Sequence, residues 1–105
     1  MLATQNCRYG IRRPKAIVFA CGDGNWLVNR LRWSRWGGRV AIGTGIERQK
    51  SCDPSCAAGR IVSQPVTVRL YRRRACAGRT HLYYRSATLV YNSGRRAAVS
   101  VPCPY

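Results

Sequence analysis

Acidic residues are scarce in this chain of 105 residues. Its three acids, Asp23, Glu47 and Asp53, face nineteen Lys and Arg residues, and the formal net charge is +16. His81 is the single histidine. General acid–base catalysis needs paired carboxylates or a histidine with an orienting partner, and these residues stand in no such pattern. We therefore expect a protein that is not an enzyme and has no catalytic residues.

Long apolar segments are also missing. No run approaches the roughly 20 apolar residues of a transmembrane helix, and the first six residues, MLATQN, contain no apolar core of a signal peptide. Gly22-Asp23-Gly24 fits a hairpin turn better than a phosphate-binding loop, because no helical pattern follows it. The sequence thus predicts no transmembrane segment and no cofactor.

Cysteine, in contrast, is plentiful. The six cysteines are Cys7, Cys21, Cys52, Cys56, Cys76 and Cys103. An even number in a small chain is typical of a disulfide framework, which persists in oxidising compartments. Zinc is a weaker alternative, because the C-x3-C pair has no second paired cluster, and catalytic thiols are weaker still. We expect no metal, and a secreted or envelope-associated protein whose signal peptide has been removed.

Alternation of apolar and polar residues dominates the chain, and nothing convincing repeats at helical spacing. The strand candidates are residues 16–21, 26–33, 40–47, 61–71, 81–91 and 97–101. Turn residues such as Gly37-Gly38 and Asn92-Ser93-Gly94 separate them. About six to seven short strands predict an all-β fold, a small antiparallel β-sandwich or barrel stapled by disulfides. One domain is expected, with residues 1–15 as an N-terminal arm and residues 16–103 as the sheet core.

Three details of these strands bear on packing. Gly43 and Gly45 lie on one face of segment 40–47, which indicates that an aromatic ring or another backbone approaches closely. Pro65 lacks an N–H donor, so it should begin or kink its strand or lie at an edge. One face of the strand at 26–33 is expected to carry Leu27, Leu31 and Trp33.

The strand order also suggests a disulfide pairing. If consecutive strands alternate in direction, Cys76 and Cys103 lie near one end of the sheet, and we favour that pair. Cys21 lies near the other end with the two cysteines of segment 52–56. We therefore expect Cys21 to pair with one of those two, and Cys7 with the other.

Arginine supplies most of the positive charge, since only Lys15 and Lys50 are lysines. High-GC codon usage raises Arg over Lys but does not explain the scarcity of acids, so extreme basicity favours an anionic partner. We assign anion binding to the clusters in expected loops and termini, namely Arg12, Arg13, Arg35, Arg72, Arg73, Arg74, Arg95 and Arg96. The alternating strands place Arg72–Arg74 and the Arg35–Arg39 hairpin at one end of the sheet. There they form either one basic surface or separate solvated clusters.

The segment Arg30–Arg39 also contains two tryptophans. Arginine over an aromatic face is a stable pairing that stacks on bases or covers sugar faces. We expect Trp33 to lie in the core, whereas Trp36, in the turn, fits a core position and an anion-binding position equally well.

Several ordered motifs resemble a group of small exported actinobacterial proteins. They are IVFACGDGN, LRWSRWGG, A-x-G-x-G, CDPSCAAG and PVTVRLYRRRAC-x-GR, and they span Ala16 to Tyr91, with Cys103-Pro104 at the end. The resemblance implies export, a small domain stapled by cysteines and a high-GC source, and it implies no activity. The chain departs from the pattern where Arg35 replaces a frequent Ser, and in its dense Arg72–Arg74 cluster.

These observations lead to three functional hypotheses. The first is a non-enzymatic exported module that binds anionic polymers or surfaces, such as an envelope polyanion, an anionic lipid or extracellular nucleic acid. The second is a secreted inhibitor of a trypsin-like protease that presents the Arg72–Arg74 loop to an acidic specificity pocket. The third is a purely structural envelope protein whose charge has no ligand.

Overall fold

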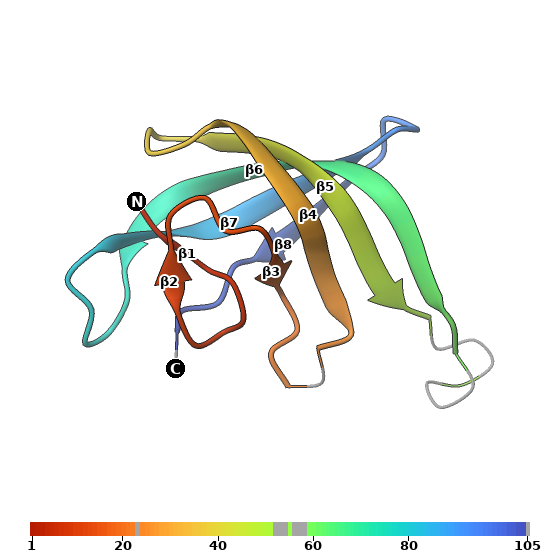
Figure 1. Ribbon diagram of the computed structural model, residues 1–105, viewed down its shortest axis with the longest axis horizontal. Helices are drawn as coiled ribbons and strands as arrows, with labels where there is room; N and C mark the ends of the chain where they lie inside the picture. The colour runs from red at the N-terminus through yellow and green to blue at the C-terminus, as the bar shows by residue number, and fades with distance from the viewer. Residues whose placement is uncertain (23, 52–54, 56–58, 105) are drawn as a thin grey trace.

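The computed structural model describes residues 1–22, 24–51, 55 and 59–104. These residues form eight strands: β1 (Ala3–Thr4), β2 (Gly10–Ile11), β3 (Ile17–Val18), β4 (Trp26–Arg35), β5 (Ala41–Lys50), β6 (Ile61–Ala75), β7 (Leu82–Tyr91) and β8 (Arg96–Ser100). Strands β3 to β8 make one antiparallel sheet in chain order, and β1 and β2 make a separate hairpin. The sheet curls into a half-barrel (Figure 1). The all-β antiparallel prediction is confirmed.

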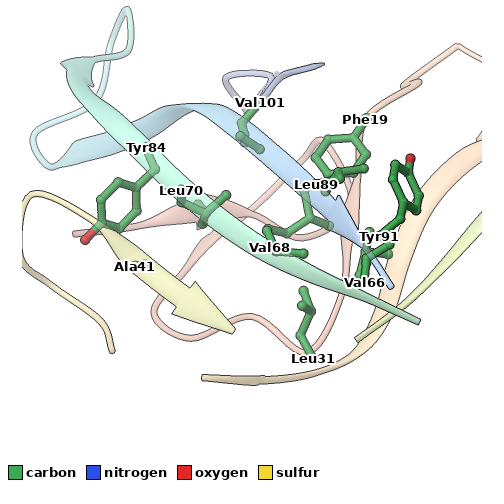
Figure 2. Packing of buried hydrophobic residues seen from close by; sticks show 14 residues of the cluster. Phe19, Leu31, Ala41, Val66, Val68, Leu70, Tyr84, Leu89, Tyr91 and Val101 are labelled. Carbon is green, nitrogen blue, oxygen red and sulfur yellow. The ribbon is translucent and has the colours of Figure 1, made fainter. Parts of the chain in front are cut away.

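The inner face of the sheet carries the hydrophobic core. Along β6, Val66, Val68 and Leu70 are buried at every second position, as their alternation predicts. Leu89 and Tyr91 of β7 point into the same interior (Figure 2). Because the sheet is curled, the side chains on its inner face pack against one another. Their common burial therefore favours the curved sheet.

Strand β4 contains a β-bulge that the sequence did not predict. Its register with β5 shifts within Asn29–Arg32, where Arg30 adopts a φ of 52°. A bulge moves the following side chains to the other face. Val28 before it and Leu31 after it are therefore both buried, whereas Leu27 lines an outer depression. The expectation that Leu27 and Leu31 share a face is wrong for this reason.

The inner face of β5 is small because β4 presses against it. A Cβ on Gly43 would lie 2.7 Å from Cε3 of Trp33, and a Cβ on Gly45 would lie 2.6 Å from the carbonyl oxygen of Asn29. Real Cβ atoms do not approach so closely. The close approach of an aromatic ring and a backbone that these glycines predict is confirmed.

Strand β6 is longer than its sequence suggests. It includes Arg72–Arg74, which we expected in a loop, and Arg73 and Arg74 pair with Tyr84 and Tyr83 of β7. Pro65 lies inside β6 and opposite β5, so it neither begins nor ends the strand. The ladder from β6 to β7 begins at the next residue, so Pro65 still lies at a local edge, as expected of a residue without an N–H donor.

Two disulfides fasten the N-terminal arm and the C-terminus. Cys76 pairs with Cys103, the pair that the strand order favours. Cys7 pairs with Cys21, so the expectation that Cys21 joins a cysteine of segment 52–56 is wrong. The reason is that the arm folds back on β3, where the Val18 N–H donates to the Gln5 carbonyl. Cys52 and Cys56 lie outside the described residues.

Candidate anion-binding surface

Glu47 is the one acidic residue in the described part of the chain, and it is 1 % exposed. Its carboxylate accepts hydrogen bonds from Trp26 Nε1 at 2.9 Å, Gln64 Nε2 at 3.0 Å and the Tyr91 hydroxyl at 2.7 Å. Burial and the bond to this carboxylate raise the pKa of Tyr91 to about 12. All the donors are neutral side chains, so Glu47 acts as an interior hydrogen-bond acceptor and places no negative charge on the surface.

The outer face of the sheet is basic and rich in hydroxyl groups. Residues directly opposite each other in a sheet share a face, and two such rows cross the strands from β4 to β8. One row consists of Arg35, Ile42, Arg69, Thr88 and Ala98, and the next of Arg32, Thr44, Thr67, Val90 and Arg96. The four arginines in these rows are exposed. Because neighbouring strands lie about 4.8 Å apart, Arg35 and Arg69 are about 10 Å apart along their row.

Arg35 and Arg72–Arg74 lie at the same end of the sheet, as the alternating strands predict. Ala41 pairs with Leu70, so the turn between β4 and β5 lies beside the end of β6, at the left of Figure 1. Arg35 and all of Arg72–Arg74 are exposed. The topology therefore gathers these side chains into one basic end.

Arg12 and Arg13 lie between β2 and β3, in the segment that packs against the Trp33 side of β4. The Pro14 carbonyl accepts the indole N–H of Trp33 at 2.8 Å, which fixes this segment beside β4. Both arginines are exposed. They directly follow the N-terminal hairpin of β1 and β2, and the described contacts do not join them to Arg72–Arg74.

Arg95 and Arg96 occupy the opposite end of the sheet, in and after the turn between β7 and β8 (Figure 1). The guanidinium carbon of Arg95 lies 4.8 Å from the centroid of the Tyr91 ring, which is a cation–π contact. The described structure thus separates this predicted pair from the basic end, although Arg96 belongs to an outer row.

Trp36 packs against the core and is partly buried. Its ring meets those of Trp33 and Tyr84 edge to face, at centroid distances of 4.8 Å and 5.2 Å, and its N–H donates to the Met1 carbonyl. Tyr84 is fully buried, which raises its pKa, and its hydroxyl donates to the Gly38 carbonyl. The aromatic group closes the interior beneath the basic end. Trp33, which was expected in the core, is partly buried and packs against it.

Three arginines adopt a backbone conformation that L-residues rarely occupy. The φ angles are 50° for Arg13, 52° for Arg30 and 60° for Arg72. Glycine or asparagine is the common choice in this region, and another side chain costs about 1–2 kcal/mol there. All three side chains are exposed, so burial does not explain their retention.

The sequence analysis assigned no anion binding to Arg32, Arg48 and Arg69, which are exposed on the outer face. We sought anion binding in loops, where long basic side chains stay hydrated. The signal was nevertheless present, because Arg69 alternates with the buried Val68 and Leu70, and a residue between two buried ones must point outwards.

The described residues bring no group of three or more His, Cys, Asp and Glu side chains together. They also include no helix of the length and apolarity needed to cross a membrane. No protein-family model matches the chain, and searches of curated proteins and of solved structures also find no match. The function must therefore be argued from the chain's own geometry.

Proposed function

We propose that this protein is a non-enzymatic, exported module that binds anionic polymers or surfaces through its arginine clusters. One observation carries the proposal: the single acid in the described part of the chain is buried, while the arginines lie outside. A surface with one sign of charge attracts polyanions and releases their counterions on binding. The relevant polyanions are envelope polymers, anionic lipid surfaces and extracellular nucleic acid.

The strained arginines support a role for their side chains. Arg13, Arg30 and Arg72 each hold a conformation in which glycine would be more stable. A charge that served only solubility would be equally effective at an unstrained position. Strain retained at exposed arginines is typical of functional sites.

The disulfides support the export part of the proposal. Cys7–Cys21 and Cys76–Cys103 are consistent with an oxidising compartment. The resemblance to small exported actinobacterial proteins points the same way. The inhibitor hypothesis needs Arg72–Arg74 in an accessible loop, whereas they lie in β6, and Arg73 and Arg74 pair with β7.

The test is retention of the whole disulfide-bonded protein on immobilised heparin, with fluorescence anisotropy on labelled polyanions at about 50 mM salt. Binding should weaken with salt, and log affinity should fall by roughly 0.7–0.9 per phosphate contact for each decade of salt. No binding to any polyanion at this salt concentration overturns the proposal. Binding that does not change with salt also overturns it, because charge would not be the cause.

A further inference from the structure

Two depressions lie on the outer face of β4 and β5. The first has a volume of about 270 Å³ and is lined by residues that include Leu27, Asn29, Arg48 and Lys50. The second has a volume of about 350 Å³ and is lined by Arg30, Arg32, Thr44, Gly45, Ile46 and Pro65. Each therefore combines two cations with apolar groups.

The two depressions adjoin and form one track along the strands. Asn29 of the first depression pairs directly with Ile46 of the second across β4 and β5. From Lys50 to Thr44 the track follows β5 for six residues, which is about 20 Å at the rise of a strand. Arg48 and Lys50 project at alternate positions, so their stems are about 6.8 Å apart. Such a track fits a chain with repeated charges better than a compact anion.

The bulge in β4 shapes this track. Asn29 lines the first depression and Arg30, with its positive φ, lines the second, although neighbouring residues of a regular strand point to opposite faces. The backbone of Gly45 forms part of the floor, and a Cβ there would point away from the track, to the inner face of the sheet. The bulge thus places Arg30 on the outer face directly after Asn29, where its guanidinium lines the same depression as Arg32.

The track's chemistry identifies the class of polymer. Three of its four cations are arginines, whose planar fork matches phosphate oxygens. No aromatic ring lines either depression among the described residues, so a base has no platform on which to stack. The floor is aliphatic, with Leu27, Ile46 and Pro65, and suits a backbone of CH and CH₂ groups.

We propose that this track binds a linear phosphodiester polymer of an acyclic polyol, with the polymer running along β4 and β5 and its phosphates on Arg30, Arg32, Arg48 and Lys50. The inference rests on the proposed polyanion binding and deepens it. It assigns the ligand class and the direction of the ligand on the sheet.

The experiment compares two variants of equal charge in the full disulfide-bonded protein. The track variant is R30N/R32S/R48S/K50S, and the control variant is R39S/R72N/R73S/R74S, in which R72N matches R30N because both sites have positive φ. The probe is labelled poly(glycerol phosphate), and single-stranded DNA with the same number of phosphates is the competitor. Melting curves check that both variants fold. If either fails to fold, the double variants R48S/K50S (track) and R73S/R74S (control) replace them.

We expect the track variant to bind poly(glycerol phosphate) at least about tenfold more weakly than the control, with a salt slope lower by about 3. Equal losses in the two variants overturn the track while polyanion binding itself stands. Tighter binding of single-stranded DNA than of poly(glycerol phosphate) overturns the ligand class. If the wild-type protein binds neither probe, the proposed function fails first.

Discussion

Replacing Glu47 by Leu tests the interior hydrogen-bond acceptor on which the fold depends. The substitution leaves the donors of Trp26, Gln64 and Tyr91 without their acceptor. A buried donor without a partner costs about 1–3 kcal/mol. Gln64 is half-buried and can turn to water, so two donors count, and the apolar gain of burying Leu offsets part of their cost. We expect a net loss of about 2–4 kcal/mol of unfolding free energy.

The matched control is Glu47→Gln, which keeps the shape and one carbonyl oxygen. That oxygen still accepts from Trp26 and Tyr91, and the amide of Gln64 can turn to accept from the new NH₂ group. E47Q should therefore lose less than half as much stability as E47L. Near-UV circular dichroism during heating, with disulfides intact, measures both variants, and E47L should melt at least about 8 °C lower than the wild type. If E47L melts at or above the wild-type temperature, the desolvation cost of the carboxylate outweighs its hydrogen bonds and the reasoning fails.

Three further predictions concern pH, cross-links and packing. The pKa of Tyr91 is raised from 10.0 to about 12, so its contribution to stability is complete below pH 10 and is lost as pH rises through about 12; urea unfolding in this range should show the decline, and Y91F should flatten it. Replacing Cys76 and Cys103 by serines opens a disulfide with a sequence separation of 27 and should lower the unfolding free energy by roughly 3.5 kcal/mol. The same change at Cys7 and Cys21, with a separation of 14, should lower it by roughly 3 kcal/mol. The reverse order in urea unfolding would contradict the chain-entropy argument. Gly45→Ala puts a Cβ 2.6 Å from the Asn29 carbonyl and should cost about 1–3 kcal/mol, so an unchanged melting temperature would mean that β4 is not held against β5.

The alternation of side chains predicted the sheet well because burial has the same period as the strand. Val66, Val68 and Leu70 are inside as expected, and the glycines of β5 face Trp33 and the backbone of β4. The bulge was not predictable, because the residue with positive φ is Arg30 and not the glycine or asparagine that usually takes this conformation. Tertiary packing places it there, with the Leu31 N–H bound to the Lys15 carbonyl of a distant segment.

The candidate site was predicted in part. The sheet order alone brings Arg35 and Arg72–Arg74 to one end, and that required no side-chain detail. The Cys7–Cys21 pair depends on how the N-terminal arm folds back on β3, and the outer track depends on the bulge in β4. Both involve contacts between residues that are distant in sequence, such as Leu31 with Lys15. No anion-binding role was predicted for the arginines in strands, because arginines on the exposed face of a strand are also common as solvated residues without a ligand.

The net charge of +16 limits how closely copies of this protein can bind along one polymer. The molecule measures 43 × 29 × 19 Å, and electrostatic repulsion extends about 30 Å at 0.01 M salt but about 8 Å at 0.15 M. At low salt, neighbouring copies should therefore stay about a molecular width apart, and the second copy should bind less tightly than the first. At physiological salt, they should approach contact even though each one binds more weakly. The polymer length occupied per copy should thus shrink as affinity falls, so crowding on the polymer and strength of attachment respond to salt in opposite directions.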